Sequence, residues 1–406
     1  MLQTPPLALY AHFPWCVRKC PYCDFNSHAI KGALPEQRYV DLLVRDFERQ
    51  MAVLGDRPVT TVFLGGGTPS LFTPDAIDRL FAGLRQFANF VSRAEVTLEA
   101  NPGTIERGRF SEYGAAGVNR VSLGAQSFSA RHLEKLGRIH SAHDTEVAVA
   151  ELRSAGIENF NLDLMYGLPE QTPAQAIADL DAALALEPSH LSHYQLTLEP
   201  GTAFFHAPPV LPADGETWQM QLESQACLAK AGFEQYEVSA YARPGRECRH
   251  NLNYWEFGDY IGIGAGAHGK LTDAQHHRIV RTERPRGPRA YMESIESGHA
   301  PSAVAVEIAE LPFEFALNAL RLRAGFSRAL YEARTGSPVE SLARAISRAS
   351  SRGLLVENGP EAWRCSELGY RFLNDLLQLF LAEYPAAQAD SYAQGQTMVP
   401  ATMRCD

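Results

Sequence analysis

The sequence lacks any apolar run that approaches the roughly 18 residues of a membrane-spanning helix. Its first stretch, MLQTPPLALYAHFPW, has neither a basic flank nor the apolar core of a signal peptide. It also lacks an internal repeat with a period of roughly 20–50 residues, which excludes solenoid and propeller architectures. We therefore expect a globular protein of the cytoplasm.

Positive charge is scarce as well. The 37 Lys and Arg residues stand against 47 Asp and Glu residues, which gives a formal net charge of −10. A chain with this balance is not built mainly to coat nucleic acid or an anionic membrane. Hydrophobic residues make up 45% of the sequence and charged residues 21%, as in ordinary globular proteins, and 406 residues are enough for two or three domains.

Cysteine is sparse, and its distribution excludes a disulfide framework. Of seven cysteines, Cys16, Cys20 and Cys23 lie together in the stretch YAHFPWCVRKCPYCDF, and the other four are scattered. Thiolates are soft ligands, so three of them on a loop after a strand select zinc or an iron–sulfur cluster. His12 or His28 is near enough in sequence to complete a zinc site, so the spacing alone leaves both alternatives open.

The first half of the chain has the pattern of repeated βα units around a parallel sheet. From Leu7 to about Glu199, short apolar runs alternate with segments of helical period. Thr73 and Thr172, each followed by proline, are expected to cap helices that cover the outside of the sheet. The expected strands are Leu7–Phe13, Val59–Leu64, Glu95–Ala100, Val118–Gly124, Asn159–Met165 and Leu191–Leu198.

The rest of the chain changes character twice. Residues 1–242 form the expected barrel unit, and residues 243–302, which are rich in Gly, Pro, Arg and His, are expected to form a connecting region with functional loops. Residues 303–385 show two helical periods, a hairpin with its turn at Gly359 and a further helix, an order typical of winged-helix domains. Residues 386–406 are expected to be disordered.

A glycine-rich segment ends the second expected strand. The stretch FLGGGTPS, residues 63–70, contains three glycines, whose lack of side chains allows a ligand to approach the backbone closely. A phosphate loop is excluded because the Lys-Ser/Thr of that motif is absent. An iron–sulfur cubane held by three thiolates leaves one iron with an open coordination position, where a metal performs chemistry.

Together, C-x3-C-x2-C after the first strand and GGGTPS after the second resemble the radical S-adenosylmethionine (SAM) enzymes. The later motifs LEANPG, SLGAQSF, LGRIH and NLDLMYGLPEQT resemble the coproporphyrinogen dehydrogenase and HemW group of that family. The resemblance implies a partial (β/α)6 TIM-like barrel, a [4Fe–4S] cluster on the three clustered cysteines and SAM chelated by the open iron. The SAM contacts that it implies are Tyr10, Tyr22, Gly66, Gly67, Thr68, Glu99, Gln126, Arg138 and Asp163.

The positions of three of these residues agree with the resemblance. Glu99, Gln126 and Asp163 each lie at or near the carboxyl end of an expected strand. In βα barrels this is the face where ligands bind.

A second motif, HNLNYW, resembles the H-N-x-x-Y-W sequence that HemW proteins carry and that is associated with haem binding. Imidazole is a common axial ligand of haem iron, and the aromatic side chains offer flat apolar faces to a porphyrin. The haem contacts that the motif implies are His250, Asn251, Tyr254 and Trp255.

The nearby stretch GIGAGAHG contains G-x-G-x-x-G and has Glu283 about twenty residues further on, as a dinucleotide-binding fingerprint requires. The context does not fit, because polar KLTDAQHH follows in place of an amphipathic helix. We interpret this stretch as a flexible loop near the SAM pocket, with His268, His276 and His277 as loop or solvent-facing residues.

Two departures separate the chain from the dehydrogenases of this group. Phe25 occupies the position of their fourth cysteine, and only a short segment precedes Cys16. We therefore expect a haem chaperone without dehydrogenase activity, a monomer or dimer that receives electrons from a donor and passes haem to acceptors such as respiratory-chain haemoproteins, some of them membrane-associated. The alternatives are an oxygen-independent coproporphyrinogen III dehydrogenase, which decarboxylates propionates through a 5′-deoxyadenosyl radical, and a zinc-stabilised binding protein.

Overall fold

The computed structural model describes residues 1–103 and 108–381. The strands of its main sheet are β1 (Leu7–Phe13), β4 (Val59–Gly66), β5 (Phe90–Ala100), β6 (Arg120–Gln126), β7 (Phe160–Tyr166), β8 (His190–Gln195), β9 (Glu234–Glu237), β10 (Ala240–Ala242), β11 (Asp259–Ile263), β12 (His268–Asp273), β13 (Arg278–Glu283) and β14 (Ser302–Ala305). Within these described residues the sheet has 12 strands in the order β14-β13-β12-β11-β1-β4-β5-β6-β7-β8-β10-β9.

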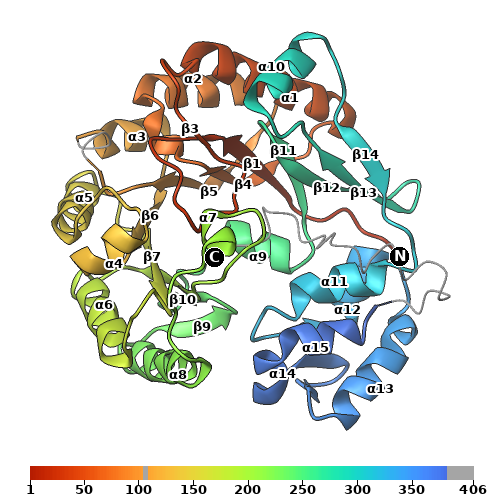
Figure 1. The fold of residues 1–406 in the computed structure, drawn as a ribbon. Helices are drawn as coiled ribbons and strands as arrows, with labels where there is room; N and C mark the ends of the chain where they lie inside the picture. The colour runs from red at the N-terminus through yellow and green to blue at the C-terminus, as the bar shows by residue number, and fades with distance from the viewer. Residues whose placement is uncertain (104–107, 382–406) are drawn as a thin grey trace.

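The six strands expected from the sequence are confirmed and form the centre of this sheet. The strands β1, β4, β5, β6, β7 and β8 are successive parallel neighbours, and Figure 1 shows them curving around the middle of the molecule. Every residue of β1 is buried, as expected for a parallel strand that is covered on both faces. The fold is thus the partial α/β barrel that the sequence predicts.

Helices surround this curved sheet on its outer face (Figure 1). Thr73 and Thr172 cap two of them as predicted, since their side chains accept hydrogen bonds from the amides of Ala76 and Gln175. The helices are α1 (Glu36–Leu54), α2 (Pro74–Leu84), α3 (Phe110–Ala116), α4 (Ala130–Lys135), α5 (Ala142–Ser154), α6 (Pro173–Ala185), α8 (Asp214–Lys230) and α10 (Pro288–Glu296).

Residues 243–302 are more ordered than the sequence suggests. They contain β11, β12, β13 and the helix α9 (Arg249–Trp255), and β11 pairs in parallel with β1. The strands β12, β13 and β14 continue the sheet in antiparallel fashion to its edge. An apolar pattern does not reveal β12 and β13 because they carry few apolar residues, one in β12 (HGKLTD) and two in β13 (RIVRTE), and β14 has only four residues.

The C-terminal unit has the expected order of helices and hairpin, and its own hydrophobic core. A tight turn at Gly359 (φ +101°) joins the antiparallel strands of the hairpin, and residues 386–406, expected to be disordered, lie outside the described residues. Its elements are α11 (Leu311–Ala319), β15 (Phe326–Ser327), α12 (Arg328–Thr335), α13 (Ala343–Ser351), β16 (Leu355–Glu357), β17 (Ala362–Cys365), α14 (Glu367–Arg371) and α15 (Leu373–Gln378).

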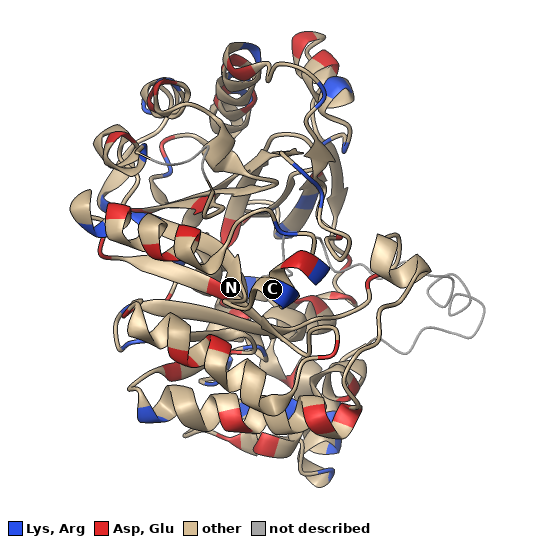
Figure 2. Cartoon of the chain, turned by 60° about the vertical axis from the view of Figure 1, so that its left-hand side comes forward, with Lys and Arg blue, Asp and Glu red and all other residues tan. Residues whose placement is uncertain are grey.

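Charged residues of both signs are interspersed on the surface helices (Figure 2). Some form ion pairs between neighbouring elements, such as Arg38 with Glu296, which joins α1 to α10 at 2.8 Å. Within the described part of the chain, no helix is long and apolar enough to cross a membrane.

Candidate functional site

One cavity, with a volume of about 270 Å³, collects all but one of the predicted site residues. It lies inside the curved sheet, and side chains of β1, β4, β5, β6, β7 and β8 contribute to its wall. Trp255 is the predicted residue that does not line it. The predicted residues that do are Tyr10, Cys16, Cys20, Tyr22, Cys23, Gly66, Gly67, Thr68, Glu99, Gln126, Arg138, Asp163, His250, Asn251 and Tyr254.

The three clustered cysteines lie on a loop whose two ends are tied together. The short strands β2 (Trp15–Cys16) and β3 (His28–Ala29) pair in parallel at its base. Each sulfur has a hydrogen-bonding neighbour, which suits a thiolate that carries negative charge. The contacts are Thr68 Oγ1 to Cys16 Sγ at 3.6 Å, Arg138 Nη1 to Cys20 Sγ at 3.6 Å, and Ser27 Oγ with Cys23 Sγ at 3.8 Å.

The thiols fit an iron–sulfur cluster better than a single zinc ion. Burial raises the pKa of Cys16 and raises that of Cys23 to about 11, so both stay protonated at neutral pH until a metal displaces the proton. In residues 1–103 and 108–381, no three His, Cys, Asp or Glu side chains converge to hold one ion. A cluster does not require such convergence, because each thiolate binds a different iron.

His12, a candidate fourth ligand for zinc, is already engaged. Its Nδ1 pairs with the Tyr10 hydroxyl at 2.9 Å and its Nε2 with the Asn26 carbonyl at 2.9 Å. Burial lowers the pKa of His12 to about 4, so the ring is neutral. The Asn26 side chain in turn donates to the carbonyls of Ala265 and Arg286, both at 2.9 Å. This chain of contacts fixes the base of the cysteine loop to the sheet.

The glycines of GGGTPS have a packing role that the sequence did not indicate. Gly66 has φ +112°, and a Cβ there would lie 2.4 Å from the His12 ring. A Cβ on Gly67 would lie 2.6 Å from the carbonyl oxygen of Trp15, and the next amide, of Thr68, donates to that same oxygen at 2.8 Å. The glycines therefore allow the end of β4 to pack directly against the cysteine loop.

Two half-buried carboxyl groups, those of Glu99 and Asp163, line the cavity near each other. Glu99 accepts a hydrogen bond from the Gly66 amide at 3.0 Å, and burial together with the nearby Asp163 raises its pKa to about 8. Burial also raises the pKa of Asp163, which accepts from Ser122 at 3.2 Å and from Asn161 at 2.6 Å. Perturbed carboxyl groups inside a cavity are typical of a ligand site, and this pair favours a ligand with hydroxyl groups or positive charge.

Gln126 and Arg138 are held by residues that the sequence analysis missed. Gln126 has φ +66° and its side-chain oxygen accepts from the Tyr194 hydroxyl at 2.7 Å. Arg138 donates to the side chain of Asn101, which itself donates to the Thr68 hydroxyl at 2.9 Å. Asn101 thus links the glycine segment to the arginine beside the cysteines. Asn101 directly follows β5, the strand that carries Glu99, and this position in the sequence was the signal that it belongs to the site.

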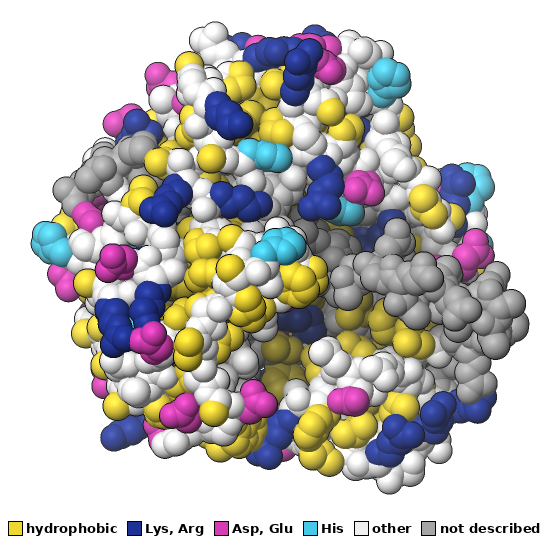
Figure 3. All heavy atoms as spheres, viewed as in Figure 1, with side chains coloured by type: hydrophobic (Ala, Val, Ile, Leu, Met, Phe, Trp, Pro, Cys, Tyr) yellow, Lys and Arg dark blue, Asp and Glu magenta, His cyan; other side chains and the backbone are white. Residues whose placement is uncertain are grey.

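The helix α7 (Ala203–His206) forms a rim beside the cysteine loop. The Phe204 amide donates to the Pro21 carbonyl at 2.9 Å, and the rings of Phe204 and Tyr22 lie 6.4 Å apart. The next residue, Phe205, is 47% exposed. Hydrophobic side chains gather around this part of the surface in Figure 3, so the rim offers an apolar contact surface next to the cavity.

The HNLNYW motif forms α9, which closes the inner end of the cavity. The amides of Arg249 and His250 donate to the Glu95 carboxylate at 3.1 and 3.0 Å, so this carboxylate caps the helix. Both ring nitrogens of His250 are engaged, Nδ1 with the Thr61 hydroxyl at 2.9 Å and Nε2 with the Tyr254 hydroxyl at 2.8 Å. Burial lowers the pKa of His250 to about 3, so its imidazole is neutral.

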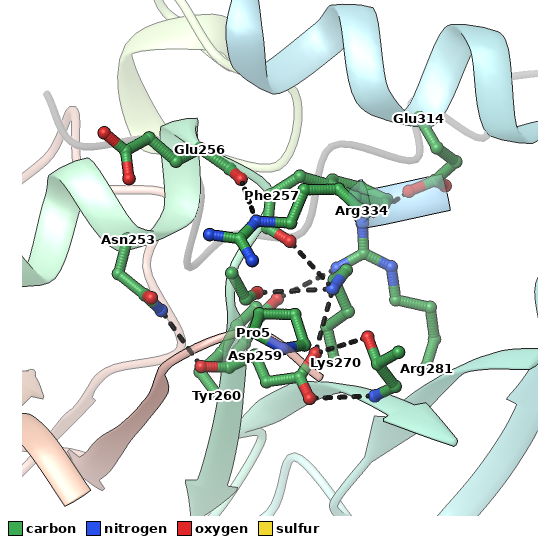
Figure 4. Close-up of polar contacts among 12 residues, drawn as sticks. Pro5, Asn253, Glu256, Phe257, Asp259, Tyr260, Lys270, Arg281, Glu314 and Arg334 are labelled. Atoms are coloured by element: carbon green, nitrogen blue, oxygen red, sulfur yellow. Dashed lines mark hydrogen bonds and ion pairs between the residues drawn. The ribbon is translucent and has the colours of Figure 1, made fainter. Parts of the chain in front are cut away.

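Trp255 points away from the cavity, toward the C-terminal unit. It is 1% exposed, and the Arg321 guanidinium lies 4.4 Å from its ring centroid. Figure 4 shows how the chain is held directly after α9: Lys270 donates to the Phe257 carbonyl and to the Asp259 carboxylate, both at 3.0 Å. A haem contact of Trp255 stays a prediction. It requires Trp255 to leave its packing against Arg321.

The stretch GIGAGAHG is a tight turn that supports the cysteine loop. Its ends belong to β11 and β12, so the prediction of a flexible loop is wrong there. A Cβ on Gly264 would lie 2.4 Å from the His12 carbonyl oxygen, and one on Gly266 would lie 2.4 Å from the Asn26 side chain. Gly266 lines the cavity, as expected of a segment near the pocket.

Comparisons with known proteins agree with this geometry. Residues 10–183 match the family model "Radical SAM superfamily", and residues 308–372 match "HemN C-terminal domain". The chain is 48% identical to the protein named heme chaperone HemW from Escherichia coli and 44% identical to the one from Haemophilus influenzae. Each of these matches covers 94% of this chain and 100% of the relative.

Among solved structures, the coproporphyrinogen III oxidase HemN of Escherichia coli, described as a radical SAM enzyme, aligns with a TM-score of 0.79. The sequences are 21% identical, and the alignment covers 93% of this chain and 90% of that one. This match shows the shared fold.

A partial barrel with three cysteines on the loop after its first strand and a glycine-rich end to its second defines a radical SAM protein. Within that class the chain belongs to the HemW family, since it spans the whole length of relatives that share almost half of its residues.

Proposed function

We propose that this protein holds a [4Fe–4S] cluster on Cys16, Cys20 and Cys23, binds SAM in the cavity beside it, and carries haem to acceptor haemoproteins. The observation that carries the proposal is a single cavity that joins three cysteine thiols to polar side chains from four neighbouring parallel strands. The relatives named heme chaperones support the haem part.

The residues around the thiols suit the cluster and SAM. Thr68 and Arg138 donate to the sulfurs, which offsets the negative charge of thiolate ligands. Glu99 and Asp163 are placed to accept hydrogen bonds from ribose hydroxyls and to face a sulfonium charge, and Gly66, Gly67 and Thr68 line the same cavity beside the cysteines. Bound together, the cluster and SAM supply one-electron chemistry, while these residues orient SAM and shield it from water.

His250 has the electronic state of an iron ligand, but it is not free in this conformation. Its neutral imidazole carries a lone pair, yet both nitrogens are hydrogen-bonded and the residue is 1% exposed. Iron ligation through Nε2 therefore has to replace the bond to Tyr254. A cavity of about 270 Å³ is also slightly smaller than the range of about 300–1,000 Å³ for drug-sized ligands, so a macrocycle that reaches His250 has to widen it.

A haem titration followed in the visible spectrum tests the proposal. The reconstituted wild type is compared with His250→Ala, with Tyr254→Phe, and with the control His143→Ala, which changes an exposed histidine on α5. We expect tight, stoichiometric binding that weakens at least roughly tenfold in His250→Ala. Tyr254→Phe frees Nε2 and is expected to bind haem at least as tightly as the wild type, and His143→Ala is expected to match it.

The outcomes separate the candidate functions. Equal binding by the wild type and His250→Ala would mean that HNLNYW is a structural motif and that haem binds elsewhere. No haem binding at all would contradict the carrier function, and vinyl formation from coproporphyrinogen III would then identify a dehydrogenase. Acid-labile sulfide after anaerobic reconstitution would exclude the zinc alternative.

A further inference from the structure

Arg120, on β6, is a buried cation whose hydrogen-bonding groups are unused. Its side chain is 2% exposed, lines the cavity and makes no hydrogen bond with any other residue that the structure describes. A guanidinium carries five N–H donors, and buried donors without acceptors cost free energy. Buried side chains of this kind nearly always have a partner, so the missing partner is expected to be a ligand.

The acidic groups near Arg120 already have other partners. The Glu95 carboxylate accepts from the first amides of α9, including that of His250, and from the Cys248 thiol. The Asp163 carboxylate accepts from neighbouring side chains on both of its oxygens. Both carboxylates balance the charge of the guanidinium at a distance, but neither uses its N–H groups.

A second unused group lines the same cavity. The side-chain amide of Asn251, which is 9% exposed, makes no hydrogen bond within the described part of the chain, and its oxygen is fully enclosed. Since the two ends of an amide exchange places by rotation about one bond, Asn251 can present an N–H to a ligand. Arg120 also lies near His250, because its charge contributes to the lowered pKa of that ring.

We propose that Arg120 is the anchor of a carboxylate-binding subsite at the inner end of the cavity, and that the carboxylate is a propionate group of a tetrapyrrole. The inference rests on the proposed haem function for the identity of the ligand. A planar guanidinium matches a carboxylate through two parallel N–H···O bonds, and this geometry is out of reach for lysine. The Glu95 and Asp163 carboxylates lie near Arg120 and balance its charge. Selectivity for a carboxylate ligand therefore comes from the directed N–H···O bonds and not from the net charge of the subsite.

The test compares protoporphyrin IX with its dimethyl ester, which differ only in the carboxylate groups, and includes haem as the diacid that carries iron. Haem, iron-free protoporphyrin IX and protoporphyrin IX dimethyl ester are titrated against the wild type, Arg120→Gln, Arg120→Lys and the control Arg131→Gln, whose arginine pairs with Glu170 on the surface. We expect Arg120→Gln to weaken binding of the two diacids at least roughly tenfold and to leave that of the ester unchanged. Arg120→Lys, which keeps the charge, is expected to bind the diacids with an affinity between those of the wild type and Arg120→Gln. The control Arg131→Gln is expected to match the wild type.

SAM affinity, measured on the same samples, reports whether the variants keep the fold of the cavity, and we expect it to be unchanged. Equal affinity of the wild type and both Arg120 variants for haem would overturn the subsite alone, as would equal affinity of the wild type for diacid and ester. Absence of haem and porphyrin binding by the wild type would overturn the proposed haem function together with the subsite.

Discussion

Replacing Glu99 by glutamine should change how SAM affinity depends on pH. In the ligand-free cavity, burial and the nearby Asp163 raise the pKa of Glu99 to about 8, so its carboxyl group is mostly protonated at neutral pH. A ligand that donates hydroxyl groups and carries positive charge binds the ionised carboxylate better. Binding of SAM below the pKa of Glu99 therefore releases a proton, and affinity is lost as the pH falls through about 8.

The size of the effect follows from the ionised fraction. With a pKa of about 8, roughly 3% of Glu99 is ionised at about pH 6.5 and roughly 75% at about pH 8.5. Because apparent affinity scales with the fraction of protein in the binding-competent state, SAM should bind the wild type roughly 25-fold more weakly at the lower pH. This ratio corresponds to roughly 2 kcal/mol.

Isothermal titration calorimetry of the reconstituted protein between these two pH values measures the ratio directly. The amino group of SAM itself titrates near pH 8, so the difference between the wild type and Glu99→Gln is the quantity of interest. The control Glu146→Gln, on the exposed face of α5, should follow the wild type. Equal pH slopes for the wild type and Glu99→Gln would refute the reasoning, and so would the absence of proton release in buffers of different ionisation enthalpy.

The contacts of single residues give three more expected outcomes. Cys20→Ser should lose the cluster, since a hydroxyl is a poor ligand for iron, whereas Cys227→Ser, outside the cavity, should keep it; full iron and sulfide content in the former would contradict the ligand assignment. Arg138→Met should lower the midpoint potential of the cluster by roughly 50 mV, because the guanidinium beside Cys20 stabilises the more negative reduced state; an unchanged potential in an EPR-monitored redox titration would exclude this role. Gly66→Ala should cost roughly 2–4 kcal/mol of unfolding free energy, because its Cβ meets a histidine ring at 2.4 Å, whereas Gly156→Ala, with φ +75° and open space around it, should cost roughly 1 kcal/mol; equal urea midpoints would show that the clash relaxes freely.

The features that depend on local sequence were predicted well. The six central strands and the helix starts at Thr73 and Thr172 follow from apolar runs and capping residues, which act over a few positions along the chain. The strands β12 and β13 were missed because they carry few apolar residues. In β12 two buried positions are polar, since Lys270 and Thr272 bond to the Asp259 carboxylate of β11.

The sequence by itself determined the chemistry at the mouth of the cavity. The spacing of Cys16, Cys20 and Cys23 is local, and so is the run of glycines that follows β4, so both were visible before the fold was known. The identity of the hydrogen-bonding partners was not visible from the sequence, because these partners come from segments far apart in the chain. Only the tertiary structure placed α9 across the inner end of the barrel and engaged both nitrogens of His250. It also left Nε of Arg120 without a partner among the described residues, since sequence patterns show which residues are buried but not what they face.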